Sequence, residues 1–265
     1  MSEENNKETE GQKPSEADIK NAERILVVPK LLVESYINST NREHIQGPIL
    51  TPLVAKIVHS CMSYLAPRGA VEKDTRVLQP IPYGCIMEGD SKVLVYRRTS
   101  HGGEKRLENK YSIGFGGHVN ISDVRMYISK MNITKDGLIE PEQDTLLNGP
   151  LAECVRRELK EELGLEECFA RVDVDEAIYD PSEDVSSVHI GIPYIIHLED
   201  LSVIKVNENT IDDLQWLTLD ELNTPERQDK LEGWSKIMVS RLINYRDYEK
   251  EDKTAEAVKD EEAKD

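Results

Sequence analysis

The strongest constraint on the fold is an amphipathic helix expected over residues 150–163. Its apolar side chains recur every four residues, at Leu151, Val155, Leu159 and Leu163. This spacing places them on one side of a helix. Pro150 suits the first turn, where a proline forfeits no intrahelical hydrogen bond, and Gly164 is typical of a helix end. A helix with one apolar side must bury that side against another layer of structure.

Strands and further helices are expected on both sides of this helix. Apolar and β-branched runs predict strands at 25–28, 77–87, 92–97, 168–179, 188–198, 203–206 and 214–217. Helical spacing predicts helices over 52–65 and 234–245. Because Pro80 and Pro82 lack an N–H group, we expect the 77–87 strand to become regular only near Tyr83. The mixed order of elements predicts an α/β or α+β fold.

Charge and composition divide the chain into one central region and two polar ends. Residues 1–22 and 246–265 are rich in charge and poor in apolar side chains. We therefore expect both ends to be disordered or frayed, with a single domain over 23–245. The formal net charge of -18 disfavours duplex nucleic acid as a partner, because binding it requires basic side chains. No apolar run is long enough to span a membrane.

The cysteines and the start of the chain bear on the compartment. The four cysteines are widely separated and form no CxxC pair: Cys61, Cys85, Cys154 and Cys168. Such thiols suit a reducing environment better than a disulfide framework or a zinc site. The acidic start lacks the apolar stretch of a secretory signal. These features predict a cytoplasmic protein.

The polar side of the 150–163 helix carries three carboxylates within one turn. Glu158, Glu161 and Glu162 lie at positions i, i+3 and i+4, where side chains are neighbours. Carboxylates this close repel each other unless a cation lies among them, and Mg²⁺ prefers oxygen ligands. The alternative interpretation is a solvated helix surface, on which Arg157 and Glu161 form an ordinary i,i+4 pair.

The residues around these carboxylates resemble the Nudix hydrolase superfamily. Residues 157–165, Arg-Glu-Leu-Lys-Glu-Glu-Leu-Gly-Leu, match the second half of the family's sequence box at every specified position. Gly116-Gly117 resembles the glycine pair that opens the box, and residues 216–222 resemble the Trp-containing strand and acidic turn that follow it. The two halves are much further apart here than in the family pattern. An insertion is therefore expected over 121–147, within a box that spans 116–165.

The resemblance implies an α/β/α sandwich with a mixed sheet. It also implies Mg²⁺-dependent cleavage of a phosphoanhydride bond in a nucleoside diphosphate-linked small molecule, with Mn²⁺ as a substitute cation. The implied metal ligands are the backbone carbonyl of Gly116 and the side chains of Glu158, Glu161 and Glu162. Arg157 would orient these glutamates.

The resemblance leaves the general base and one supporting acid open. The implied catalytic residues are Glu161, Arg157 and Glu162, with Glu161 as the first choice of base. The alternative bases are loop acids: Glu183, Asp184 and Glu208. Counting back from Arg157 places the first acid of the box on Gly149, so we expect Glu153 or Glu142 to replace it.

Basic residues before the glycine pair are candidates for binding substrate phosphates. The expected set is Arg97, Arg98 and Arg106 with Gly117, and Lys105 lies beside it. The alternative is that these are solvated loop charges. His118 and His189 are expected to be structural.

Two other functions remain open on this sequence. A Nudix-fold module that binds a nucleotide without cleaving it would tolerate loss of the glutamates, which are intact here. An isomerase of isopentenyl diphosphate on the same fold would need a cysteine in a matching loop, and no such cysteine is evident. Fold alone does not decide the substrate. Assembly into a homo-oligomer is also left open.

Overall fold

The computed structural model describes residues 15–39, 50–59, 62–99, 107–131, 146–166, 169–181, 186–207 and 211–262. The strands are β1 (Arg24–Pro29), β2 (Tyr64–Pro67), β3 (Val77–Glu88), β4 (Lys92–Arg98), β5 (Tyr111–Ser112), β6 (Gly114–Phe115), β7 (Phe169–Val174), β8 (His189–Leu198) and β9 (Ile211–Thr218). The helices are α1 (Glu16–Ala22), α2 (Lys30–Ser39), α3 (Leu50–His59), α4 (Arg68–Val71), α5 (Ile121–Lys130), α6 (Pro150–Leu163), α7 (Leu219–Leu222), α8 (Pro225–Lys230) and α9 (Gly233–Glu262). Two short 3₁₀ turns are η2 (Ser186–Val188) and η3 (Leu201–Val203).

A mixed sheet organises the fold. At its centre β3 runs parallel to β8, with Gln79–Met87 in register with His189–His197. The other strand pairs in the described residues are antiparallel, and they add β1, β4, β6, β7 and β9 around this centre. The expected mixed sheet is therefore confirmed.

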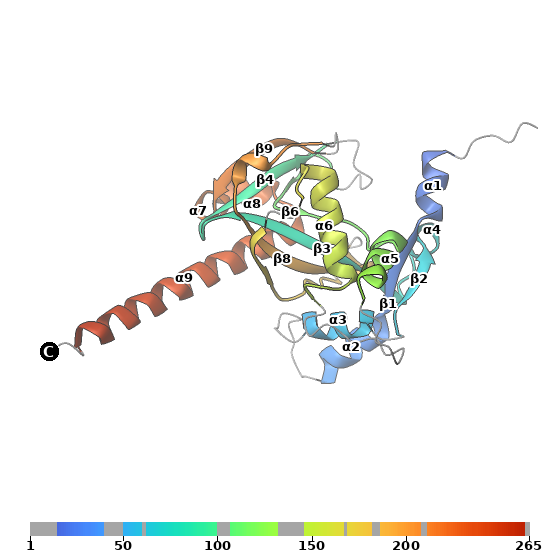
Figure 1. Cartoon of the computed structure of the whole chain (residues 1–265), viewed down its shortest axis with the longest axis horizontal. Coiled ribbons are helices and arrows are strands. Elements are labelled where there is room, and N and C mark those ends of the chain that lie inside the picture. The colour runs from blue at the N-terminus through green and yellow to red at the C-terminus, as the bar shows by residue number, and fades with distance from the viewer. Residues whose placement is uncertain are drawn as a thin grey trace, which may run out of the picture.

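Helices cover both faces of the sheet, which gives the expected α/β/α layering (Figure 1). Alternate residues of a strand face opposite sides. In β3, Ile86 faces a core that includes α2, α3 and α6, whereas Cys85 and Met87 face a core that includes α7 and α9. The apolar side of α6 is buried in the first of these cores, as its sequence spacing predicts.

Helix α6 has the predicted bounds, Pro150–Leu163, and ends as expected. Gly164 adopts the left-handed conformation, with φ of 65°, and its N–H group donates to the Lys160 carbonyl at 3.0 Å. The helix predicted over 52–65 ends earlier, at His59, because Tyr64–Pro67 pairs with β1 as a strand. Apolar spacing continued past the true end of this helix.

Strand β3 is regular from Val77, so the expected interruption at its prolines is wrong. Pro80 and Pro82 both lie in register with β8. On the other side, β3 pairs with β1 at 77–78 and with β6 at 84–85. Because no described strand pairs with that side between these contacts, the missing N–H groups interrupt no ladder there.

The strand predicted over 203–206 is also absent from the structure. The chain instead passes the C-terminal end of α6, where the N–H groups of Lys205 and Asn207 donate to the carbonyls of Leu163 and Glu162, both at 2.9 Å. The last carbonyls of a helix lack partners within the helix. Satisfying them takes this segment out of the sheet.

Helix α1 lies within the first of the polar ends, and α9 extends into the second. Ser15 and Asp18 cap α1, each side chain accepting a hydrogen bond from the other residue's backbone N–H group. At the other end, α9 runs on to Glu262 and projects beyond the sheet (Figure 1). No helix of the described residues is long and apolar enough to cross a membrane.

Candidate active site

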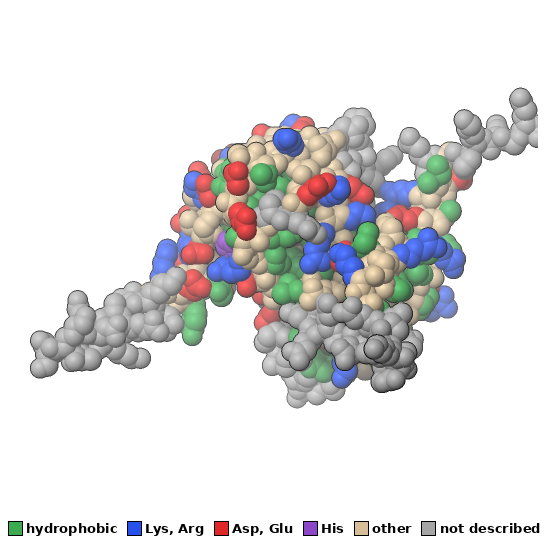
Figure 2. Space-filling view, in the orientation of Figure 1, with side chains coloured by type: hydrophobic (Ala, Val, Ile, Leu, Met, Phe, Trp, Pro, Cys, Tyr) green, Lys and Arg blue, Asp and Glu red, His purple; other side chains and the backbone are tan. Residues whose placement is uncertain are grey.

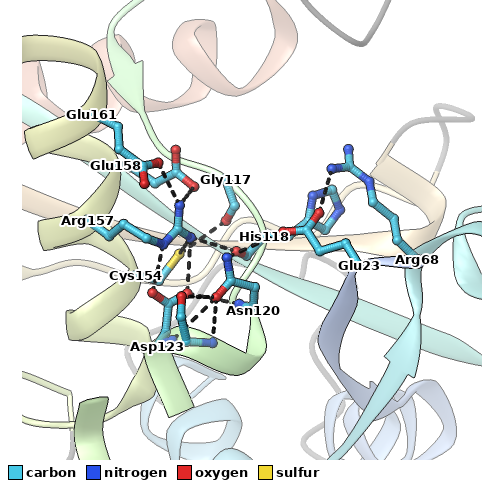
Figure 3. Close-up of polar contacts among 11 residues, drawn as sticks. Glu23, Arg68, Gly117, His118, Asn120, Asp123, Cys154, Arg157, Glu158 and Glu161 are labelled. Atoms are coloured by element: carbon cyan, nitrogen blue, oxygen red, sulfur yellow. Dashed lines mark hydrogen bonds and ion pairs between the residues drawn. The ribbon is translucent and has the colours of Figure 1, made fainter. Parts of the chain in front are cut away.

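The glycine pair lies where the backbone passes between β3 and α6. A Cβ atom on Gly117 would lie 2.3 Å from Oε1 of Glu158, and one on Gly116 would lie 1.9 Å from the carbonyl oxygen of Pro82. A side chain at Gly116 would force the loop away from the strand, whereas one at Gly117 would displace the Glu158 carboxylate. Glycine thus lets the loop approach the carboxylates of α6 (Figure 3).

Arg157 donates hydrogen bonds through all three of its guanidinium nitrogens, and two of them join α6 to α5 and the loop. Its Nε and Nη2 donate to the two carboxylate oxygens of Asp123 at 2.8 and 3.0 Å. Nη2 also donates to the carbonyl of His118 at 3.0 Å. Nη1 donates to Glu158 at 2.8 Å and to Glu161 at 3.0 Å (Figure 3). A single side chain thereby fixes the positions of two candidate ligands relative to the loop.

Asp123, which was not among the residues expected at the site, takes the supporting role expected for Glu153 or Glu142. Glu153, expected to support Arg157, instead pairs with Lys130 at 2.9 Å and with Arg156 at 3.2 Å. The other expected acid, Glu142, lies outside the described residues. Asp123 is 2% exposed and holds Arg157 in their place.

The spacing from the glycine pair would have found Asp123. Five residues separate it from Gly117, as in the first half of the family's box, with aspartate in place of glutamate. Counting back from Arg157 reaches Gly149 instead, because more residues separate Asp123 from Arg157 than in the family pattern. Asp123 lies on α5, so the beginning of the 121–147 segment contributes directly to the site.

Burial affects the pKa values of two charged residues at the site, Glu158 and Arg157. Burial raises the pKa of Glu158 to about 7, despite the opposing effect of the Arg157 guanidinium. Burial also acts against the charge of Arg157, but its bonds to Asp123 and the nearby Glu158 hold its pKa above the usual range. Glu158 is thus a carboxylate that further positive charge would stabilise.

The glutamate side chains at this site have the chemistry that a divalent cation requires. Within the described part of the chain, no three His, Cys, Asp or Glu side chains already form a metal-binding group. Glu158 and Glu161 instead converge on one cationic nitrogen of Arg157. Carboxylate oxygens arranged around a positive charge are the donors that Mg²⁺ and Mn²⁺ prefer. Glu162, on the same turn, is half-buried.

Of the predicted phosphate-binding arginines, the two that the structure describes already bind carboxylates. Arg97 forms a two-bond ion pair with Asp212, at 2.9 and 3.0 Å. Arg98 donates to Glu232 at 2.8 Å. The remaining predicted loop residues lie outside the described residues: Lys105, Arg106, Glu183, Asp184 and Glu208.

His118 and His189 lie together beside the glycine pair. Their Nε2 atoms are 3.4 Å apart, and Nε2 of His118 is 2.8 Å from Oε1 of Gln79. Burial, with the nearby charge of Arg68, holds the pKa of His118 well below its usual value. These contacts agree with the structural role expected for His118.

A buried polar cluster ties the start of α9 to the strands that lead into the glycine pair. Oε1 of Glu232 accepts hydrogen bonds from Ser112 at 2.6 Å and from Tyr83 at 3.0 Å. Oε2 of Glu232 accepts from Arg98 at 2.8 Å. Ser235 is 2.8 Å from the Tyr83 hydroxyl. We infer that this cluster mainly stabilises the fold, because its charges and hydroxyls satisfy each other.

Changing Glu232 to glutamine is expected to lower the free energy of unfolding by about 2 kcal/mol, because a charge-assisted bond to Arg98 is lost. Denaturant or thermal unfolding would measure this, with a fall in melting temperature of about 4–8 °C. Glu226→Gln is the matched control, since Glu226 forms an exposed pair with Lys230 and should show little change. Equal stability of both variants would contradict a stabilising role for the cluster.

Basic side chains lie on the surface around α5. On the face shown in Figure 2, Lys and Arg side chains gather over α5 and the neighbouring N-terminal elements. A phosphate-bearing molecule approaching this face meets local positive charge despite the net charge of -18.

Comparisons with known proteins give the same class as this fold and site. A family model, the NUDIX domain, matches residues 137–241. Protein YmaB of Bacillus subtilis (strain 168) is 32% identical over 177 residues, which are 66% of this chain and 76% of that protein. The chain therefore belongs to the Nudix family. As an enzyme it is a Nudix-type pyrophosphohydrolase.

A solved structure shows the same fold. The crystal structure of Tm1382, assigned to the Nudix hydrolases, is similar with a TM-score of 0.54 and 22% identity, covering 84% of this chain and 99% of that one. The NUDIX domain of Shewanella oneidensis NrtR, solved with ADP ribose, is a more distant likeness. Its TM-score is 0.38 and its identity 15%, over 64% of this chain and 86% of that chain.

Proposed function

We propose that this protein hydrolyses a phosphoanhydride bond in a nucleoside diphosphate-linked small molecule, with Mg²⁺ or Mn²⁺ as its cofactor. The observation that carries the proposal is the pair of hydrogen bonds that Arg157 donates to Asp123. They hold the guanidinium so that its third nitrogen contacts both Glu158 and Glu161 beside Gly117. This arrangement gathers carboxylates beside the glycine pair. A solvated helix surface would have no need of a buried acid to hold its arginine.

Four groups would hold the cation: the Gly116 carbonyl and the carboxylates of Glu158, Glu161 and Glu162. When bound, the cation neutralises the diphosphate and lowers the pKa of the attacking water. The protein's own task is to position these groups. Arg157 does so because Asp123 prevents its guanidinium from swinging away.

Glu161 is our choice of general base. Its side chain is 49% exposed, whereas that of Glu158 is 15% exposed. A water that attacks phosphorus must reach the carboxylate that takes its proton, so the more accessible side chain suits this role. Glu162 would act with it as a ligand.

For substrate binding we propose Gly117 and Arg106, with Arg97 and Arg98 in a secondary role. Arg97 and Arg98 already have carboxylate partners in Asp212 and Glu232. A phosphate would have to compete with those partners for either guanidinium. We also propose a cytoplasmic location, because the free thiols of Cys85 and Cys154 suit a reducing compartment.

A substrate screen tests the function. Nucleoside diphosphate-linked compounds would be incubated with the full chain in ¹⁸O-labelled water, with Mg²⁺, with Mn²⁺ or with a chelator, and the products weighed by mass spectrometry. We expect at least one compound to be split between its phosphates, with one ¹⁸O atom in a phosphate product and no turnover under chelation. Binding of a nucleotide without any product would favour the non-catalytic module instead.

A further inference from the structure

The N-terminal segment lies directly against the loop that follows the glycine pair. The N–H group of Leu26, on β1, donates to the carbonyl of Val119 at 2.7 Å. Ile25 forms an antiparallel bridge with Asn120. These backbone contacts join β1 to the two residues that precede α5. Residues 24–29 are thus a neighbour of the site, although they lie outside the 137–241 match to the family model.

Further hydrogen bonds extend this contact to Asp123, the buried partner of Arg157. Nδ2 of Asn120 donates to Oε1 of Glu23 at 3.3 Å, and Oε2 of Glu23 pairs with Arg68 at 3.3 Å (Figure 3). Oδ1 of Asn120 caps α5 by accepting from two backbone N–H groups. The backbone N–H group of Asn120 donates to Oδ2 of Asp123 at 2.9 Å.

One oxygen atom therefore links the two halves of the network. Oδ2 of Asp123 accepts from the Asn120 backbone and also from Nη2 of Arg157 at 3.0 Å. If Asn120 moves, this oxygen loses a donor and its position changes. Nη1 of Arg157 then moves relative to the two glutamates that it contacts.

We propose that Glu23 and Asn120 are positioning residues, which fix Asp123 and through it Arg157 and the glutamates. The inference rests on the proposed function for its kinetic consequence, and on the geometry alone for its structural one. Small displacements of groups that orient reactants can cost up to about a hundredfold in rate. The N-terminal segment is then a working part of the site.

A reversal of donor and acceptor tests the proposal. Asn120→Asp keeps an oxygen that caps α5 but replaces the donor to Glu23 with a second negative charge. We expect kcat to fall about tenfold, with KM changed by less than about twofold. Adding Glu23→Gln should restore kcat to within about threefold of the parent, because the glutamine amide can donate to the new carboxylate.

A second measurement does not need a substrate. The Nε–H group of Arg157 is bonded to Asp123, so its NMR signal should exchange slowly with water in the parent. We expect faster exchange in Asn120→Asp and a return toward the parent rate in the double variant. If the parent hydrolyses nothing, the proposed function fails while this signal still reports on positioning.

Glu72→Gln is the matched control. Glu72 also pairs with Arg68, at 3.1 Å, but its side chain is 42% exposed and has no contact with Asn120 among the bonds described. It should leave both kcat and Nε–H exchange unchanged. The proposal is overturned if Asn120→Asp alters neither quantity, if Glu72→Gln alters both equally, or if the double variant shows no recovery.

Discussion

Replacing Glu158 with glutamine is expected to lower turnover by about a hundredfold or more. The substitution keeps the volume of the side chain and an oxygen that can accept from Arg157, but it removes a charge that would bind the cation. Since burial already disfavours this carboxylate, the metal-free variant should melt close to the parent. Steady-state kinetics at saturating Mg²⁺, together with thermal melts, would measure both effects.

Melts with and without Mg²⁺ make the same experiment independent of substrate. A cation that binds only the folded chain raises the melting temperature by mass action. We expect this rise in the parent, a much smaller one in Glu158→Gln, and a full rise in Glu166→Gln. Glu166 is a fair control because it follows the same helix and pairs only with Lys160 among the described ion pairs. A parent that Mg²⁺ does not stabilise would argue for the solvated-surface interpretation.

Replacing Asp123 with alanine is expected to lower the free energy of unfolding by about 3 kcal/mol, because the guanidinium of Arg157 loses its buried partner. This corresponds to a fall in melting temperature of about 6–12 °C. Turnover should also fall sharply, since the guanidinium is then free to leave Glu158 and Glu161. Urea unfolding and kinetics on the folded fraction would separate the two losses.

The capping role of Asp123 needs its own control. Its carboxylate accepts from the Asn120 N–H group as part of a capping box. Glu221 has the same role in the capping box of α7, but it forms no ion pair with an arginine among those described. Glu221→Ala should therefore destabilise the protein less than Asp123→Ala does. Equal losses would mean that capping, rather than the ion pair, accounts for the effect.

Local sequence signals predicted helix α6 well. The apolar spacing of α6, with Pro150 and Gly164 at its ends, depends on contacts within a few residues, and the structure confirms its bounds. The same reasoning extended the helix at α3 too far. Met62 and Leu65 continue the helical spacing, but pairing with β1 makes Tyr64–Pro67 a strand. Long-range pairing overrode a local preference there.

The contacts that hold the site residues in place could be predicted from the sequence only in part. Asp123 was within reach of the sequence, because its distance from Gly117 fits the family's box. The hydrogen bond of Leu26 to Val119 and the ion pair of Arg98 with Glu232 join residues far apart in the chain. No periodicity or spacing marks such partners in one sequence. They follow from the tertiary fold alone.

A ribosome releases β3 long before β8, its parallel neighbour at the centre of the sheet. Until His189–Leu198 emerges, the nascent chain holds Gln79–Met87 without its main partner, and open strand edges invite pairing with other chains. Pro80 and Pro82 leave two N–H groups missing on the opposite edge of this stretch, which no described strand covers between β1 and β6. The two prolines would thus limit pairing with other chains at that edge, during synthesis and in the finished sheet.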